Sequence, residues 1–168
     1  MFSAFNNLPF DQSNEYIFGC VSKDVGDRLT EAHPMISVAV VGIGYWGKNL
    51  VRVFADISAV KTCVHTGGET NQQWLADNFP EIAVTTAYET VLRDPEIDAI
   101  VIATPTETHY ELARQAMLAG KDVFVEKPLT DSMDRSHKLA TLARETDQIL
   151  FVGYIFCHHP TIQPLLER

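Results

Sequence analysis

The sequence has few cysteines, no long apolar run and no excess of positive charge, and each shortage excludes a class of protein. Three cysteines in 168 residues form no CxxC pair, so a disulfide framework is not expected. No apolar stretch approaches the ~20 residues that a membrane-spanning helix needs. The first lysine is Lys23, so the start of the sequence lacks the basic region of a secretory signal. We therefore expect a cytoplasmic protein with reduced thiols.

Positive charge is scarce, with 13 Lys and Arg against 22 Asp and Glu and a net charge of -9. Such a field repels phosphate and argues against binding to nucleic acid or to an anionic surface. It leaves room for a single nucleotide held locally by backbone N–H groups. The composition is 46% hydrophobic, and a chain of this length can bury ~70% of its unfolded surface in one domain.

From Ile36 onward, short apolar segments alternate with helical patterns. The predicted strands span 36–41, 60–64, 82–85, 97–103, 122–125 and 149–153. Capping boxes at Thr70–Gln73, Thr86–Glu89 and Thr108–Glu111 predict where three of the helices begin. Gly120 is expected to end a helix in the left-handed conformation. This alternation predicts an α/β fold with a doubly wound parallel sheet of the Rossmann type.

Residues 1–34 show no sustained period, and we expect them to form a poorly ordered N-terminal extension. Met35 directly precedes the first predicted strand, so it is an alternative start of translation.

A GxGxxG motif follows the first predicted strand and begins a helix. The motif indicates dinucleotide binding only in this position between a strand and a helix. Gly42 permits the tight turn, Gly44 lets the backbone approach a pyrophosphate, and Gly47 allows close packing of the helix. Tyr45 and Trp46 fill the variable positions of the motif and share the predicted cofactor site. The motif predicts binding of NAD or NADP.

The second strand ends without the acid that holds the ribose of NAD. His65 and Thr66 are the candidates for lining the adenosine ribose, and Glu69 is the nearest acid downstream. No arginine stands here to bind a 2′-phosphate, and Lys61 is expected inside the strand. The sequence therefore leaves the choice between NAD and NADP open.

Two further motifs follow the fourth and fifth strands, where ligands of open α/β sheets bind. The first motif places Thr104, Pro105, Thr106 and His109 beside the predicted dinucleotide. The second is Glu126, Lys127 and Pro128. A lysine near a positively charged nicotinamide has its ammonium form disfavoured, which suits proton exchange with a substrate hydroxyl.

Three segments in this order and spacing resemble the Gfo/Idh/MocA family of sugar oxidoreductases: VAVVGIGYWGKNLVR, DAIVIATPTETHYELARQAMLAGKDVFVEKPLT, and the Gly-Tyr to His-Pro stretch at 153–160. The resemblance covers about residues 36–168. It implies that Gly42, Gly44 and Gly47 bind NAD(P), that Lys127 is catalytic beside the nicotinamide and the reacting hydroxyl, and that the peptide before Pro128 is cis.

The resemblance also implies a second, substrate-binding domain, which we expect to be absent from these 168 residues. Residues 35–153 are then the dinucleotide-binding domain, and residues 154–168 begin the crossover. The implied activity is an NAD(P)-dependent dehydrogenase of sugars or sugar nucleotides. The alternative is a truncated, non-catalytic dinucleotide-binding module. Substrate identity and homo-oligomer formation stay open, and no metal site is expected, because no carboxylate and histidine have ligand spacing.

Overall fold

The structure is a computed structural model that describes residues 20–21, 35–65 and 67–154. Thr66, most of the expected N-terminal extension and the expected crossover beyond Tyr154 lie outside the described residues.

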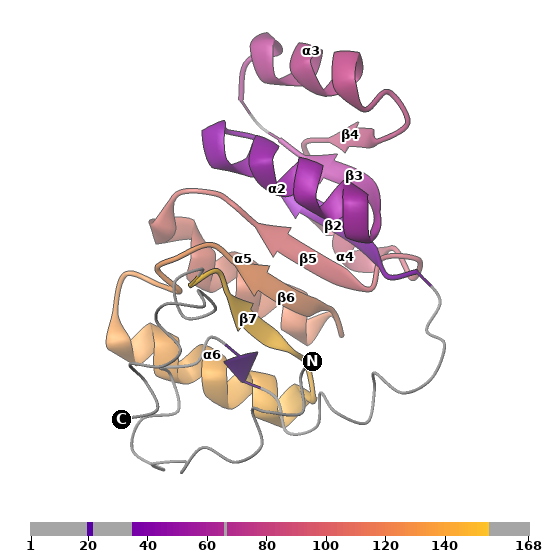
Figure 1. Ribbon diagram of the computed structural model, residues 1–168. Coiled ribbons are helices and arrows are strands. Elements are labelled where there is room, and N and C mark those ends of the chain that lie inside the picture. Colours follow the sequence, from indigo (N-terminus) through magenta and orange to yellow (C-terminus); the bar gives the residue numbers. More distant parts are fainter. Residues whose placement is uncertain (1–19, 22–34, 66, 155–168) are drawn as a thin grey trace, which may run out of the picture.

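Seven strands form one sheet in the order β1-β7-β6-β5-β2-β3-β4 (Figure 1). The six parallel strands match the predicted ones and are β2 (Ser37–Val41), β3 (Ala59–Val64), β4 (Ala83–Thr85), β5 (Ala99–Ile102), β6 (Asp122–Val125) and β7 (Leu150–Val152). The seventh, β1 (Cys20–Val21), was not predicted and pairs antiparallel with β7 at the edge of the sheet. The doubly wound parallel sheet is therefore confirmed, with one short antiparallel strand added.

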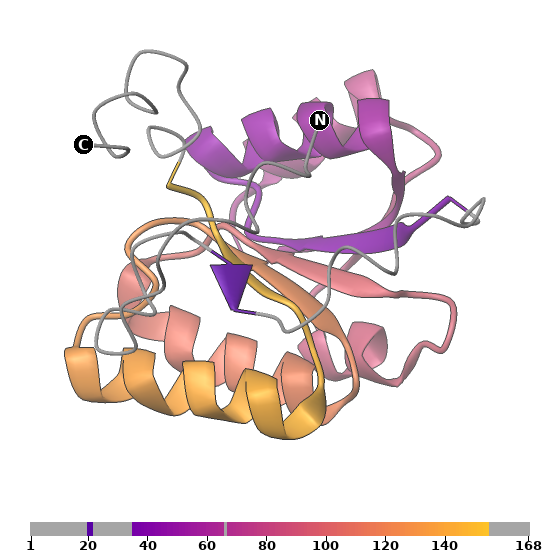
Figure 2. The ribbon, with the colours of Figure 1, turned by 60° about the horizontal axis from the view of Figure 1, so that its bottom comes forward.

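Helices cover both faces of the sheet (Figure 2). They are α2 (Tyr45–Ile57), α3 (Glu69–Asn78), α4 (Tyr88–Arg93), α5 (Thr106–Leu118) and α6 (Met133–Thr146). Because neighbouring residues of a strand point to opposite faces, β2 contributes to two hydrophobic cores. Val38 and Val40 belong to the core under α2 and α3, whereas Ala39 and Val41 belong to the core under the other three helices.

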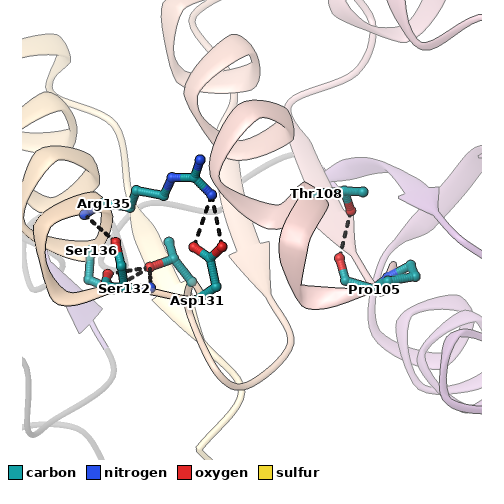
Figure 3. Close-up of polar contacts among 7 residues, drawn as sticks. Pro105, Thr108, Asp131, Ser132, Arg135 and Ser136 are labelled. Carbon is teal, nitrogen blue, oxygen red and sulfur yellow. Dashed lines mark hydrogen bonds and ion pairs between the residues drawn. The ribbon is translucent and has the colours of Figure 1, made fainter.

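The helix starts differ from the predicted capping boxes, all three of which are wrong. The N-cap residues of α3, α4 and α5 are Gly68, Ala87 and Pro105, and none of them makes a side-chain capping bond. Thr108 lies inside the first turn of α5, where its hydroxyl donates to the Pro105 carbonyl at 2.7 Å (Figure 3). The N-caps of α3 and α5 come two and three residues before the predicted Thr70 and Thr108, whereas the N-cap of α4 comes one residue after the predicted Thr86.

Among the helices that the structure describes, only α6 has a side-chain N-cap. The Ser132 hydroxyl accepts a hydrogen bond from the Arg135 backbone N–H at 3.2 Å (Figure 3). At the other end of a helix, Gly120 follows α5 with φ +76°, which confirms the expected left-handed conformation.

The strand order places the predicted motifs together. The chain leaves β2 toward β3 on one side, and β5 lies on the other side of β2 and leads to β6. This reversal between β2 and β5 is a topological switch point, and in open α/β sheets the ligand-binding crevice lies there, at the carboxyl ends of the strands. The loops after β2, β3, β5 and β6 all lie at that edge. No helix in the described residues is long and apolar enough to cross a membrane.

Candidate functional site

The glycine turn after β2 contains three glycines with different roles. Gly42 has φ +90°, and a Cβ there would lie 2.8 Å from the Ala103 carbonyl oxygen. A Cβ on Gly47 would lie 1.9 Å from the Gly42 carbonyl oxygen, so these two positions require glycine for the fold itself. Gly44 is the exposed N-cap of α2, and a Cβ there would meet nothing within 4 Å. The lack of a side chain at Gly44 therefore leaves the N-terminus of α2 accessible to an anion.

Trp46 connects the glycine turn to the loop after β6. Its indole N–H donates to Oε1 of Glu126, a residue 80 positions further along the chain. Glu126 is only 8% exposed, and its Oε2 accepts from the Lys127 backbone N–H at 3.2 Å. A Cβ on Gly153 would lie 3.2 Å from Glu126 Oε1, so that glycine leaves space for the carboxylate. Two of the predicted motifs are thus held together across the crevice.

His109 connects the loop after β5 to the loop after β6. It is 1% exposed and lies in the first turn of α5. One ring nitrogen, Nε2, is 2.9 Å from the Thr104 carbonyl oxygen, and the other, Nδ1, is 2.9 Å from the Pro128 carbonyl oxygen. Both ring nitrogens therefore face backbone carbonyl oxygens, and a neutral imidazole donates its single N–H to one of the two.

Lys127 is exposed at the same edge, and the Lys127-Pro128 peptide is cis, as the resemblance implied. Within the described residues, no carboxylate forms an ion pair with its ammonium group. Thr104 lies against the glycine turn, since its Cγ2 is 2.9 Å from the Cβ position of Gly42. Thr106 begins α5 and is half-buried. The ammonium group is therefore available to a molecule bound in the crevice.

His65 follows the last residue of β3 and is 7% exposed. Its backbone N–H donates to the Thr85 carbonyl at 2.9 Å, but its ring Nε2 is buried with no hydrogen-bond partner in the described structure. Gly67 lies over the ring, because a Cβ there would lie 2.7 Å from His65 Cε1 and 3.2 Å from Nε2. A buried nitrogen without a hydrogen-bond partner costs free energy, so the His65 ring reduces the stability of this turn.

Two basic residues of α2 were not singled out in the sequence. Lys48 Nζ and Arg52 Cζ lie 5.1 Å and 5.0 Å from the ring centroid of Trp74, which belongs to α3. Lys61, by contrast, lies within β3 as predicted and pairs with Glu96 at 2.7 Å. The spacing of four residues places Lys48 and Arg52 on one face of α2, and this spacing could have indicated from the sequence that both contact the same neighbour.

Cys63 lies in β3 close to this region, and its thiol is free and buried. Burial raises the pKa of its thiol to about 12. The thiol therefore stays protonated at neutral pH and is not a nucleophile.

A parallel doubly wound sheet with a glycine turn at its switch point defines a nucleotide-binding α/β protein. More narrowly, the chain belongs to the Gfo/Idh/MocA family, because residues 36–154 match the model described as "Oxidoreductase family, NAD-binding Rossmann fold". The predicted family and the nicotinamide dinucleotide cofactor class are thereby confirmed.

Several characterised relatives are similar to this chain. A UDP-N-acetylglucosamine 3-dehydrogenase of Acidithiobacillus ferrooxidans is 32% identical over 132 residues, which cover 76% of this chain and 40% of the relative. A scyllo-inositol 2-dehydrogenase (NAD(+)) of Bacillus subtilis is 35% identical and is matched over 71% of this chain and 36% of its own length.

Among solved structures, biliverdin reductase of Synechocystis with biliverdin and NADP+ superposes with a TM-score of 0.70 at 30% identity, covering 79% of this chain and 42% of that one. The 168 residues span 34% to 40% of the length of the first curated relatives that they match.

Proposed function

We propose that residues 35–153 bind the nicotinamide dinucleotide at the switch point between β2 and β5, with Gly44 and the N-terminus of α2 against the pyrophosphate. The observation that carries the proposal is the uncapped N-terminus of α2. Beside it lie the loop after β6, which is hydrogen-bonded to the glycine turn, and the loop after β5, which His109 connects to the loop after β6. Lys127 lies between the two contact points: Glu126, just before it, accepts from Trp46, and the carbonyl of Pro128, just after it, faces His109. They fix the geometry of the crevice before any ligand enters.

The proposed role of the whole protein is hydride transfer between a CH–OH carbon of a sugar or sugar nucleotide and the cofactor. A bound nicotinamide supplies a hydride acceptor or donor at C4. Lys127 is placed to exchange a proton with the substrate hydroxyl, since its ammonium group is exposed at this edge of the sheet. Glu126 and His109 position the Lys127 backbone, while Tyr45, Thr104, Pro105 and Thr106 line the crevice. The names of two relatives, which act on UDP-N-acetylglucosamine and scyllo-inositol, support this substrate class.

The test of the binding site is Gly44→Leu. Because the Cβ position of Gly44 is open, the variant should keep its unfolding free energy while the new side chain occupies the path of the pyrophosphate. We expect titration calorimetry to show affinity for NAD(P)H reduced by about 100-fold or more. The control is Ala119→Leu, at the end of α5 and the opposite edge of the sheet, which should bind normally. Unchanged affinity of Gly44→Leu would remove the glycine turn from the site.

The alternative is a dinucleotide-binding module without turnover. An absorbance assay of the 168-residue chain with a panel of polyols and UDP-sugars separates the two. Without walls that orient a substrate, a reaction loses ~7–11 kcal/mol of barrier reduction, so a module would show cofactor binding and no measurable turnover. Turnover that Lys127→Ala abolishes would support a complete catalytic site.

A further inference from the structure

Trp46 occupies a variable position of the glycine motif, and the proposed function uses its side chain only as a contact between two loops. Trp46 is the second residue of α2, and its side chain is 43% exposed. The indole N–H donates to Oε1 of Glu126, which directly follows β6. Because β5 lies between β2 and β6 in the sheet, this hydrogen bond spans the carboxyl end of β5.

Glu126 uses both of its carboxylate oxygens as acceptors. Oε1 accepts from the Trp46 indole N–H, and Oε2 accepts from the Lys127 backbone N–H at 3.2 Å. The Glu126 side chain is only 8% exposed, and no ion pair of the described residues includes it. A glutamine at this position could satisfy only one of the two N–H groups with its oxygen, because its amide nitrogen is a donor.

The backbone around Lys127 is therefore held from two directions. On one side, the Pro128 carbonyl oxygen lies 2.9 Å from Nδ1 of His109, whose ring is 1% exposed. On the other side, the Lys127 N–H depends on the orientation of the Glu126 side chain. That orientation depends in turn on the Trp46 indole, because a buried acceptor that loses its donor carries a cost in free energy and reorients to reduce it.

From this arrangement we infer that Trp46 is a positioning residue for Lys127, on which it acts through Glu126; the inference rests on the proposed function. Trp46 lies at the glycine turn, the proposed site of the pyrophosphate, and Lys127 is the proposed neighbour of the nicotinamide. The indole thus joins the two segments that contact opposite halves of the dinucleotide. Binding of the nicotinamide half should depend on the indole N–H, whereas binding of the adenosine and pyrophosphate half should not.

The experiment is titration calorimetry of the full 168-residue chain and its Trp46→Phe variant, which keeps an aromatic ring and loses the N–H. The ligands are NADH and NADPH, with ADP-ribose and 2′-phospho-ADP-ribose as matching probes that lack the nicotinamide. For the dinucleotide that the unmodified chain binds more tightly, we expect Trp46→Phe to lower the affinity about fivefold or more. The affinity for the matching probe should stay within about twofold.

The matched control is Trp74→Phe. The Trp74 ring contacts Lys48 and Arg52 of α2 and belongs to α3, away from the Lys127 loop. This variant also replaces a tryptophan by phenylalanine, and it should bind both the dinucleotide and the probe normally.

A spectroscopic measurement separates positioning from a general loss of structure. In nitrogen–proton correlation spectra, the backbone resonance of Lys127 should move in Trp46→Phe, whereas that of Gly120, at the opposite edge of the sheet, should not. Glu126→Gln should move the Lys127 resonance and show the same difference between dinucleotide and probe, which tests the inference even if Trp46→Phe does not fold. The double variant should bind the dinucleotide no more weakly than Glu126→Gln alone, because both substitutions act through the same contact.

The outcomes separate this inference from the proposed function. Equal losses of affinity for the dinucleotide and the probe would assign Trp46 to the glycine turn alone, and would overturn the inference while dinucleotide binding stays intact. A dinucleotide affinity that Trp46→Phe leaves unchanged, or a Lys127 resonance that does not move, would also overturn it. Failure of the unmodified chain to bind any of the four ligands would overturn the proposed function, and the inference with it.

Discussion

Two buried histidines at the same edge of the sheet differ in how their polar atoms are satisfied. His109, on the β5–β6 side of the crevice, has both ring nitrogens within 2.9 Å of a backbone carbonyl. His65, on the β3 side, has a buried Nε2 without a partner. Of the described helices, only α6, which follows β6, has a side-chain cap, from Ser132; α5 on the same side and the helices after β3 and β4 have none.

The two sides therefore differ in hydrogen bonding. The loops on the β5–β6 side, which we call the rigid side, are joined by side-chain hydrogen bonds, whereas the β3 side has a buried polar atom without a partner. On the β5–β6 side, hydrogen bonds between loops fix the positions of Thr104, Glu126 and Lys127 before a ligand arrives. On the β3 side, His65 Nε2 is buried without a partner and the N-terminus of α3 has no side-chain cap. Variants on the two sides should therefore have different effects, with losses of stability on the first and almost none on the second.

The largest loss is expected where the two sides meet, at Gly47. The Cβ of Gly47→Ala would lie 1.9 Å from the Gly42 carbonyl oxygen, so the backbone of the turn must move. We expect the free energy of unfolding to fall by about 3 kcal/mol or more in a urea titration. Gly44→Ala in the same loop is the control and should cost about 1 kcal/mol at most, because its Cβ meets open space. Equal losses would show that the turn relaxes freely.

His109→Leu tests the rigid side directly. The variant leaves the carbonyls of Thr104 and Pro128 without their shared partner. We expect a destabilisation of about 3 kcal/mol, measured by urea unfolding. Gln115→Leu, at an exposed position of the same helix, should change stability by about 0.5 kcal/mol or less. A loss as small as that of the control would mean that the bridge between the two loops contributes nothing.

Ser132→Ala removes the cap of α6 on the rigid side. Because the Arg135 N–H loses its acceptor, the unfolding free energy should fall by about 1 kcal/mol. Ser132→Asp restores an acceptor and should restore the stability. If the aspartate variant had the same free energy of unfolding as the alanine variant, the side-chain cap would contribute nothing to stability.

Ala87→Asp adds a cap on the β3–β4 side, where α4 has none. The extended backbone of Ala87 is the conformation that a capping residue requires. We expect a gain of about 0.5–1 kcal/mol in the free energy of unfolding. Ala87→Leu cannot cap and should show no gain; a similar gain from leucine would assign the effect to packing.

The smallest effect is expected for His65→Leu. The substitution removes a buried nitrogen that has no partner, and leucine fills most of the same volume. The unfolding free energy of the ligand-free chain should change by about 0.5 kcal/mol or less, as a thermal melt would show. A loss approaching that of His109→Leu would falsify the comparison between the two sides.

The sequence by itself determined the elements and their class. Apolar runs gave six parallel strands within about two residues, and glycines at fixed spacing gave the turn after β2 and the end of α5. These signals are local, because a strand buried on both faces or a backbone with positive φ restricts the residues at that very position. The same locality explains why Gly42 and Gly47 could be recognised from the sequence as positions that require glycine.

Only the tertiary structure decided which side chains meet. The helix starts differed from the capping boxes: α3 and α5 begin before the predicted threonine, and α4 begins one residue after it. The bond from Trp46 to Glu126 joins residues 80 positions apart, and the contact of Lys48 and Arg52 with Trp74 joins two helices. Such pairs depend on strand order and on the packing of neighbouring helices, and no period or motif within one segment encodes them.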